Sequence, residues 1–122
     1  MDRFKPSLVT IFGGSGFVGT QIVQQLARRG HRIRVAVRRP DLANHVHIFG
    51  SVGQIMPIQA NIRNMASVRR AVAGAGIVIN LVGVSHSRGP QTFQAVHIDG
   101  AGNIATAARE AGVSRLVHMS AL

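Results

Sequence analysis

The sequence contains no cysteine, no tryptophan and no tyrosine in its 122 residues. Without cysteine, the chain has no disulfide framework, no thiol nucleophile and no cysteine-ligated metal site. Proteins that bind nucleic acids commonly stack bases on aromatic side chains, but the aromatic residues here are five phenylalanines. These absences exclude disulfide-rich scaffolds and thiol enzymes, and we expect no nucleic-acid partner.

Acidic residues are also scarce. Four aspartates and glutamates oppose 14 lysines and arginines, which gives a net charge of +10. Such an excess attracts phosphates, nucleic acid, anionic lipid or an acidic partner subunit. Arginines crowd residues 28–39, with no recognisable nucleic-acid docking motif around them. A solvated basic face is the simpler interpretation, and a nucleic-acid surface is the alternative.

Long apolar runs are missing as well. No stretch reaches the roughly 18 residues that a membrane-spanning helix needs, and the start at Met1 shows no signal-peptide pattern. We therefore expect no transmembrane segment and a cytoplasmic location. A hydrophobic content of 46% is enough for one domain with one core.

The most informative stretch is an apolar strand pattern that runs into closely spaced glycines and then into an amphipathic helix pattern. Bare glycine backbone exposes N–H groups to a pyrophosphate, which the positive end of the following helix also attracts. We expect Gly13 to make the tight turn, Gly16 to let the main chain approach the phosphates, and Gly19 to let the helix pack closely. The spacing also fits G-x-G-x-x-G if it begins at Gly14. The predicted binding stretch comprises Gly13, Gly14, Ser15, Gly16, Phe17, Val18 and Gly19.

The context of the glycines supports this interpretation, because a glycine-rich chain contains such spacings by chance. Residues 7–12 before them are mostly β-branched and apolar, and Val18, Ile22 and Leu26 recur every four residues after them. The alternative is that the glycines only make a turn between a strand and a helix. We favour dinucleotide binding.

From residue 7 onward the pattern alternates strand and helix, which predicts a parallel sheet with helices on both faces. The expected fold class is α/β, a Rossmann-type doubly wound parallel sheet of five strands in the order 3-2-1-4-5. Gly30 and Gly112 lie where helices often end in a left-handed residue. The expected strands cover 7–12, 32–37, 54–59, 77–82 and 115–119, and the expected helices cover 16–29, 65–73 and 92–111, with a short helical turn and a loop over 41–53.

Arg38 is the first residue after the second expected strand. A fold that prefers NAD usually has an acidic residue there for the ribose 2′-OH, whereas arginine there can pair with the 2′-phosphate of NADP. We therefore favour NADP(H) over NAD(H). The alternative is that arginine occurs here only because the chain is rich in arginine.

Two further stretches bear on possible sites. His45 and His47 have no third ligand and no nearby carboxylate, so we expect no metal. Gly83 follows a nearly continuous apolar strand, where doubly wound sheets bind their ligands. The polar loop 84–91 that follows could form one wall of a pocket or be a plain loop.

Together these motifs resemble the short-chain dehydrogenase/reductase superfamily, in its extended or atypical branch. The resemblance rests on the glycine turn, Arg38, Asn61 with Ile62, and the strand that ends at Gly83. Within that branch, several stretches resemble the NAD(P)H-binding accessory subunits of respiratory complex I and their bacterial relatives. These stretches are 68–72, 78–83, 108–113 and 117–122. Sugar-nucleotide epimerases and hydroxysteroid dehydrogenases share much of the same frame.

The resemblance implies an NAD(P)-binding domain with defined cofactor positions. It places Gly13, Gly16 and Gly19 at the pyrophosphate, Arg38 at the adenosine ribose, Asn61 and Ile62 near the adenine, and Leu81, Val82 and Gly83 beside the ribose on the nicotinamide side. Asn61 departs from the family's more usual aspartate, but its amide oxygen can still accept a hydrogen bond. The resemblance also implies complex I subunits as partners and peripheral association with the inner membrane through the complex.

The catalytic residues of the family are not found in this chain. Active members use a serine or threonine just beyond strand five and a Tyr-x-x-x-Lys on the next helix, where the lysine helps the tyrosine to act as an acid or base. This chain has no tyrosine, and Lys5 is its only lysine. Leu122 aligns with the hydroxyl position, and Ser120 lies two residues before it. We therefore assign no catalytic residue.

Two explanations follow. We favour the amino-terminal part of a longer domain without its substrate lobe, because a hydrophobic strand at an open sheet edge is normally covered. The other is a protein that binds the nucleotide without turning it over. The functions that remain are a largely structural NADP(H)-binding subunit of the respiratory complex, an NAD(P)-dependent reductase, epimerase or hydroxysteroid dehydrogenase whose catalytic Tyr and Lys lie beyond residue 122, and a regulator that senses the NADP/NADPH ratio.

Overall fold

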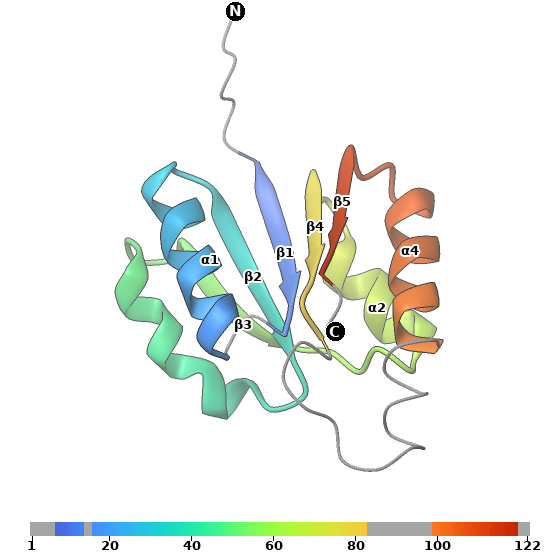
Figure 1. The fold of residues 1–122 in the computed structure, drawn as a ribbon, viewed down its shortest axis with the longest axis horizontal. Coiled ribbons are helices and arrows are strands. Elements are labelled where there is room, and N and C mark those ends of the chain that lie inside the picture. The colour runs from blue at the N-terminus through green and yellow to red at the C-terminus, as the bar shows by residue number, and fades with distance from the viewer. Residues whose placement is uncertain (1–6, 14–15, 83–98, 120–122) are drawn as a thin grey trace, which may run out of the picture.

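The computed structural model describes residues 7–13, 16–82 and 99–119 of the chain. Its elements, in order, are β1 (Leu8–Phe12), α1 (Phe17–Arg28), β2 (Arg32–Val37), the 3₁₀ helix η1 (Pro40–Phe49), β3 (Ile55–Gln59), α2 (Met65–Val72), β4 (Ile77–Asn80), α4 (Ala101–Glu110) and β5 (Arg115–His118) (Figure 1). The strands form one five-stranded parallel sheet in the order β3-β2-β1-β4-β5. This confirms the predicted fold class and strand order.

The sheet is covered on both faces, because successive side chains along each strand point to opposite sides. On one face, Ile11 and Val35 pack with α1 and η1. On the other face, Phe12 and Val78 pack with α2 and α4. Right-handed crossovers require this division, since the chain winds one way from β1 to β3 and the other way to β4 and β5. Figure 1 shows α1 and α4 on opposite flanks of the sheet.

The carboxyl ends of β1, β2 and β4 lie level with one another. Phe12 is in register with Ala36 of β2 and with Asn80 of β4. The hydrogen bonding continues one residue further, because the Gly13 N–H donates to the Ala36 carbonyl at 3.0 Å and the Leu81 N–H donates to the Phe12 carbonyl at 2.9 Å. The connections from β1 and from β4 wind in opposite directions, so the switch point of the sheet lies between these two strands.

The segment after β2 is more regular than the sequence predicts. The expected short helical turn is a 3₁₀ helix that runs through Phe49. Ala43 and Val46 are fully buried, and Phe49 packs against the same cluster. These residues are three apart, which is the period of a 3₁₀ helix. The helix therefore presents one apolar line to the α1 face of the sheet.

The buried line of α1 also differs from the prediction. Gly19, Val23 and Ala27 are the buried residues, whereas Val18 is 39% exposed. Ile22 and Leu26 are half-buried and flank this line. Gly19 has no side chain and Ala27 a small one, so the helix axis can approach the sheet, and the line of closest contact shifts one residue along the chain.

Several predicted element ends also shift. The fourth strand ends at Asn80 rather than residue 82, and the last helix is described only as α4, because residues 92–98 of the expected helix lie outside the described residues. Gly30 and Gly112 have φ values of 85° and 73°, which confirms the predicted helix ends. Within the described ranges, no helix is long and apolar enough to cross a membrane.

A buried hydroxyl and an arginine from the sheet cap the end of α2. The Thr10 side chain is fully buried and donates to the Ala71 carbonyl at 2.7 Å. The Arg34 Nη1 donates to the same carbonyl at 3.0 Å and to Ala73 at 2.6 Å. The last carbonyls of a helix have no partner within it, so these two side chains hold α2 on the sheet.

We expect Thr10→Val to lower the free energy of unfolding by about 1 kcal/mol, because it removes a buried hydrogen bond and keeps the side-chain shape. Thr20→Val is the matched control, since the Thr20 hydroxyl donates to the Phe17 carbonyl at an exposed site and should change stability by less than about 0.5 kcal/mol. Urea denaturation measures both. Equal effects of the two changes would contradict the role given to Thr10.

Candidate dinucleotide-binding site

Gly13 makes the turn at the end of β1. Its φ is 81°, a conformation that residues with a Cβ rarely adopt. A Cβ at this position would lie 3.2 Å from the Val82 nitrogen and 3.3 Å from the Leu81 carbonyl carbon. Both the backbone conformation and the close approach of the chain after β4 therefore require glycine here.

Gly16 presents the opposite situation. Its φ of −81° and ψ of −172° are extended values that any residue adopts. A Cβ at Gly16 would meet no atom of the described residues within 4 Å. Neither conformation nor packing within the described part of the chain therefore explains a glycine at this position. The absent side chain leaves a space in front of the first turn of α1 that no described residue fills.

The amino end of α1 is well suited to an anion. Gly16 is its N-cap and makes no side-chain capping hydrogen bond, and its first turn holds no acidic residue. The first N–H groups of a helix have no partner within the helix, and the helix dipole makes this end positive. Phe17 and Val18 are exposed in this turn, so they would serve a ligand chiefly through the backbone. Phosphate binds readily to such an arrangement.

The chain after β4 forms a second wall of the site. Leu81 is buried and Val82 is half-buried, and both touch the position that a Cβ at Gly13 would take. The Val82 N–H donates to Oδ1 of Asn80 at 3.0 Å, which turns the chain directly after the strand. Gly83, Gly14, Ser15 and the loop 84–91 lie outside the described residues.

Asn80 is a functional candidate that sequence reasoning missed. It is 2% exposed, and its Nδ2 lies 3.0 Å from Nδ1 of His118 on β5. Its carbonyl also accepts from the Met119 N–H at 3.0 Å. A buried polar side chain needs hydrogen-bond partners. The one asparagine within an apolar strand could therefore have indicated a polar contact at this position.

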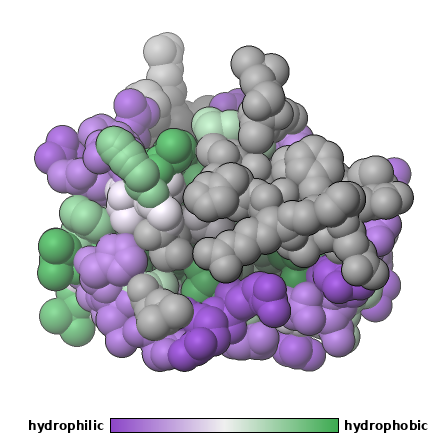
Figure 2. Space-filling view, turned by 60° about the horizontal axis from the view of Figure 1, so that its bottom comes forward, coloured by the Kyte–Doolittle hydropathy of each residue, from purple (hydrophilic) through white to green (hydrophobic). Residues whose placement is uncertain are grey.

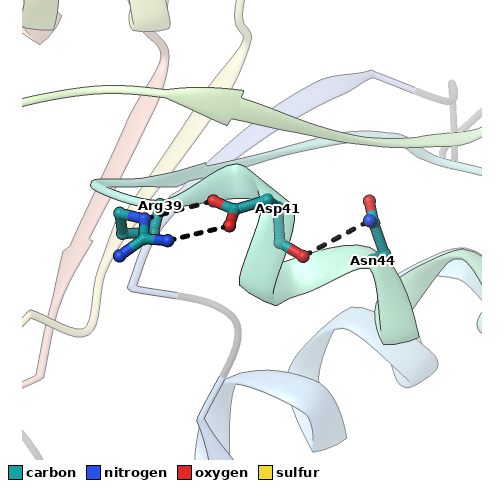
Figure 3. A network of polar contacts seen from close by, with 3 residues as sticks. All are labelled: Arg39, Asp41 and Asn44. Carbon is teal, nitrogen blue, oxygen red and sulfur yellow. Dashed lines mark hydrogen bonds and ion pairs between the residues drawn. The ribbon is translucent and has the colours of Figure 1, made fainter.

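The carboxyl end of β2 carries two arginines with different surroundings. Nε and Nη2 of Arg39 donate to the Asp41 carboxylate at 3.3 and 3.0 Å, and Asn44 donates to the Asp41 carbonyl (Figure 3). Hydrogen bonding to the Arg39 guanidinium lowers the pKa of Asp41 and raises the pKa of Arg39. Arg38 is exposed and makes no hydrogen bond or ion pair with the described residues. Its guanidinium is the one available to a ligand at this corner.

Asn61 and Ile62 lie after β3 in a tight turn. Oδ1 of Asn61 accepts from the Arg63 N–H at 3.0 Å, which leaves its second lone pair for a further donor. Ile62 is half-buried and packs against the core on the α2 face, and its carbonyl accepts from Asn103 of α4 at 2.9 Å. Ile62 therefore has a packing role as well as its predicted place near the adenine.

The predicted positions after β1, β2, β3 and β4 follow the carboxyl ends of parallel strands, so they share one edge of the sheet. Figure 2 looks onto this edge and shows a broad band of hydrophilic residues along its lower border.

Among the described residues, no cluster of His, Asp and Glu has the arrangement of a metal site. Ser120 and Leu122, which sequence reasoning compared with the family's hydroxyl position, lie outside the described residues.

Comparison with known proteins extends this geometry. Residues 10–122 match the model of the 3-beta hydroxysteroid dehydrogenase/isomerase family. The chain is 33% identical over 111 residues to the mitochondrial 40 kDa subunit of NADH-ubiquinone oxidoreductase of Neurospora crassa, covering 91% of this chain and 30% of that protein. It is 34% identical over 115 residues to a ceramide reductase of Caulobacter vibrioides, covering 94% of this chain and 35% of that protein. The chain thus spans about a third of the length of these curated relatives.

A solved structure shows the same fold. The Bordetella bronchiseptica enzyme WbmG, crystallised in complex with NAD, superposes with a TM-score of 0.80 at 23% identity, covering 95% of this chain and 38% of that one. The structural similarity shows a shared Rossmann-type fold, and at 23% identity it shows the fold alone.

We expect Gly13→Ala to lower the free energy of unfolding by about 1 to 3 kcal/mol, because it forces a Cβ into a left-handed conformation against the Val82 peptide. Gly102→Ala in α4 adds the same methyl group to open space and should leave stability unchanged or raise it by up to about 1 kcal/mol. Thermal and urea unfolding measure both. A Gly13→Ala protein as stable as the unmodified chain would contradict the close contact between β1 and β4.

Proposed function

The chain belongs to the 3-beta hydroxysteroid dehydrogenase/isomerase family, and from this premise we propose that it binds a nicotinamide dinucleotide in a protein like the complex I accessory subunits. The chain is homologous to one such subunit, the 40 kDa subunit of the Neurospora crassa NADH-ubiquinone oxidoreductase. The proposed function is binding of the dinucleotide at the carboxyl edge of the sheet.

The observation that carries this proposal is the space at Gly16, where a Cβ would meet no atom of the described residues within 4 Å. It lies in front of an uncapped helix end, on the helix that follows β1 at the switch point of the sheet. In doubly wound sheets this is where ligands bind. A pyrophosphate accounts for a glycine that neither backbone strain nor protein packing requires.

Each predicted residue has a role in the proposed complex. The Gly13 turn, the Gly16 backbone and the first turn of α1 would hold the pyrophosphate, and Gly19 keeps α1 close to the sheet. Asn61 and Ile62 would border the adenine. Leu81, Val82 and Gly83 would pass the ribose on the nicotinamide side. Gly14, Ser15 and Gly83 enter the proposal from the sequence pattern alone.

We favour NADP(H) over NAD(H) because Arg39 is paired with a carboxylate and Arg38 is not. Arg39 holds Asp41 in an ion pair, so the carboxylate nearest to Arg38 in the sequence already has a cationic partner. Arg38 has five N–H donors and no partner among the described residues. A 2′-phosphate would supply a dianionic partner with matching geometry.

The residues of this chain do not complete proton-coupled hydride transfer of the family's usual kind. When bound, the nicotinamide ring supplies hydride chemistry, but a proton donor such as the family's tyrosine is needed beside it. The chain has no tyrosine. We therefore propose that these residues bind and orient the dinucleotide, without assigning a catalytic role to any of them.

A second candidate function is catalysis by a longer protein. The identity of 34% to a ceramide reductase favours it. In that case the catalytic Tyr and Lys would lie beyond residue 122, and this segment would be the cofactor-binding part of an NAD(P)-dependent reductase, epimerase or dehydrogenase. Leu116 and Val117 on the edge strand β5 are 40% and 41% exposed, which supports a domain that continues past β5.

Partners and location follow from the same homology. We propose that the protein associates with complex I subunits and lies at the inner membrane peripherally, through the complex. An independent cytoplasmic protein is the alternative. Co-purification of the protein with the respiratory complex from detergent-solubilised membranes distinguishes the two.

We expect Gly16→Ala to weaken the binding of NADPH by about tenfold, because the methyl group displaces the phosphate from charge-assisted hydrogen bonds with the helix end. Gly102→Ala adds a methyl group to open space away from the β1 turn and should change the affinity less than twofold. Isothermal titration calorimetry measures both. Unchanged affinity in Gly16→Ala would refute the proposed phosphate position.

We expect Arg38→Gln to weaken NADPH binding about ten- to hundredfold and to leave NADH binding within about twofold, because only NADPH carries the 2′-phosphate. Arg69→Gln removes the same charge from a residue that pairs with Glu110, and controls for net charge. Titrations with both coenzymes test this. Equal losses for NADPH and NADH, or tighter binding of NADH to the unmodified protein, would remove the preference for NADP(H).

A further inference from the structure

Asn80 makes three polar contacts at the carboxyl edge, two through its side chain and one through its carbonyl. Its Oδ1 accepts from the Val82 N–H at 3.0 Å, its Nδ2 lies 3.0 Å from Nδ1 of His118, and its carbonyl accepts from the Met119 N–H. Asn80 is buried and His118 is exposed. The side chain therefore links the turn after β4 to the end of β5.

The orientation of the Asn80 amide follows from its backbone partner. A backbone N–H can only donate, so the Asn80 atom that it meets must be the oxygen. The amide nitrogen then faces His118, and an amide NH₂ group also only donates. Nδ1 of His118 is therefore the acceptor in this contact.

This chain of hydrogen bonds has a consequence for the β1 turn. If the His118 acceptor is lost, the Asn80 NH₂ group loses its partner at a buried site, and rotation of the amide would bring the NH₂ group against the Val82 N–H. The Val82 nitrogen lies 3.2 Å from where a Cβ of Gly13 would be. The path of Val82 beside Gly13 thus depends on the orientation of one amide.

We propose that Asn80 and His118 are a positioning pair, in which His118 of β5 fixes the Asn80 amide and the amide fixes the Val82 turn against Gly13 for dinucleotide binding. The pair itself is a property of the ligand-free protein. Its effect on binding rests on the proposed function. His118 acts through Asn80 and needs no contact with the ligand.

The first experiment needs no ligand. We expect His118→Phe to reduce the protection of the Val82 amide from hydrogen exchange about three- to tenfold, because Oδ1 of Asn80, which accepts from this amide, is no longer held in place. His118→Asn, which restores a side-chain oxygen acceptor, should retain most of the protection. The Leu81 N–H, bonded to the Phe12 carbonyl, is the internal control and should stay protected. Unchanged protection of Val82, or an equal loss at Leu81, would overturn the proposal.

The second experiment is a double-mutant cycle on NADPH affinity, measured by calorimetry. Asn80→Ala and His118→Phe should each weaken binding about three- to tenfold, and the double variant should bind no more weakly than Asn80→Ala alone. Additive losses would show that His118 acts without Asn80 and would overturn the proposal. If Asn80→Ala fails to fold, Asn80→Ser takes its place, since a serine hydroxyl accepts weakly from the N–H two residues on but is too short to reach His118.

The two experiments separate the pair from the proposed function. If the unmodified protein binds neither NADPH nor NADH, the proposed function fails, while the exchange of the Val82 amide still decides whether the pair exists. If NADPH binds and neither His118→Phe nor Asn80→Ala changes the affinity, the dinucleotide function stands and the positioning role fails.

Discussion

The contact between the Gly13 turn and the Leu81–Val82 backbone is the constraint on which the carboxyl edge depends. It is possible only because Gly13 has no side chain and adopts a φ of 81°. This contact brings the turn after β1 against the chain leaving β4, at the point where the sheet changes winding direction. The first residue of the turn that would carry a pyrophosphate is therefore held by packing within the protein. Gly16 then differs from Gly13 in kind, because nothing in the described part of the protein occupies the space in front of it.

The role of each arginine in this chain depends on its local partners more than on the net charge. Arg34 is part of the interior architecture, since it donates to the last carbonyls of α2. Arg39 and Arg69 have carboxylate partners on the surface, where ion pairs contribute little stability. Arg38 has none of these partners and follows directly after β2. The basic excess alone suggested many anionic ligands, and these pairings leave Arg38 as the guanidinium directly after β2 that has no partner among the described residues.

Most of the fold could be predicted from the sequence because some residue types have a single physical use. Glycine after a helix indicates a left-handed residue, as at Gly30 and Gly112, and the alternation of strands with helices predicts a parallel sheet with helices on both faces. Features that depend on packing were missed. The three-residue period of Ala43, Val46 and Phe49 was not recognised because 3₁₀ helices are usually shorter. The buried line of α1 shifted because small residues, and not the most apolar ones, lie closest to the sheet. The pairing of Asn80 with His118 joins two strands far apart in the sequence, and neither residue indicates the other.

The proposed binding site and the family's chemistry depend on different kinds of groups. Backbone N–H groups, a helix end and missing side chains hold a pyrophosphate, and residues 7–82 contain the glycines, arginine and strand ends that such a grip requires. Proton transfer needs a particular side chain with a particular acidity, and this chain has no tyrosine to supply it. A family built this way can lose catalysis by side-chain replacement while the backbone grip persists. Both a respiratory-complex subunit and a reductase match this segment, which contains the glycine turn and the strand ends but not the family's tyrosine.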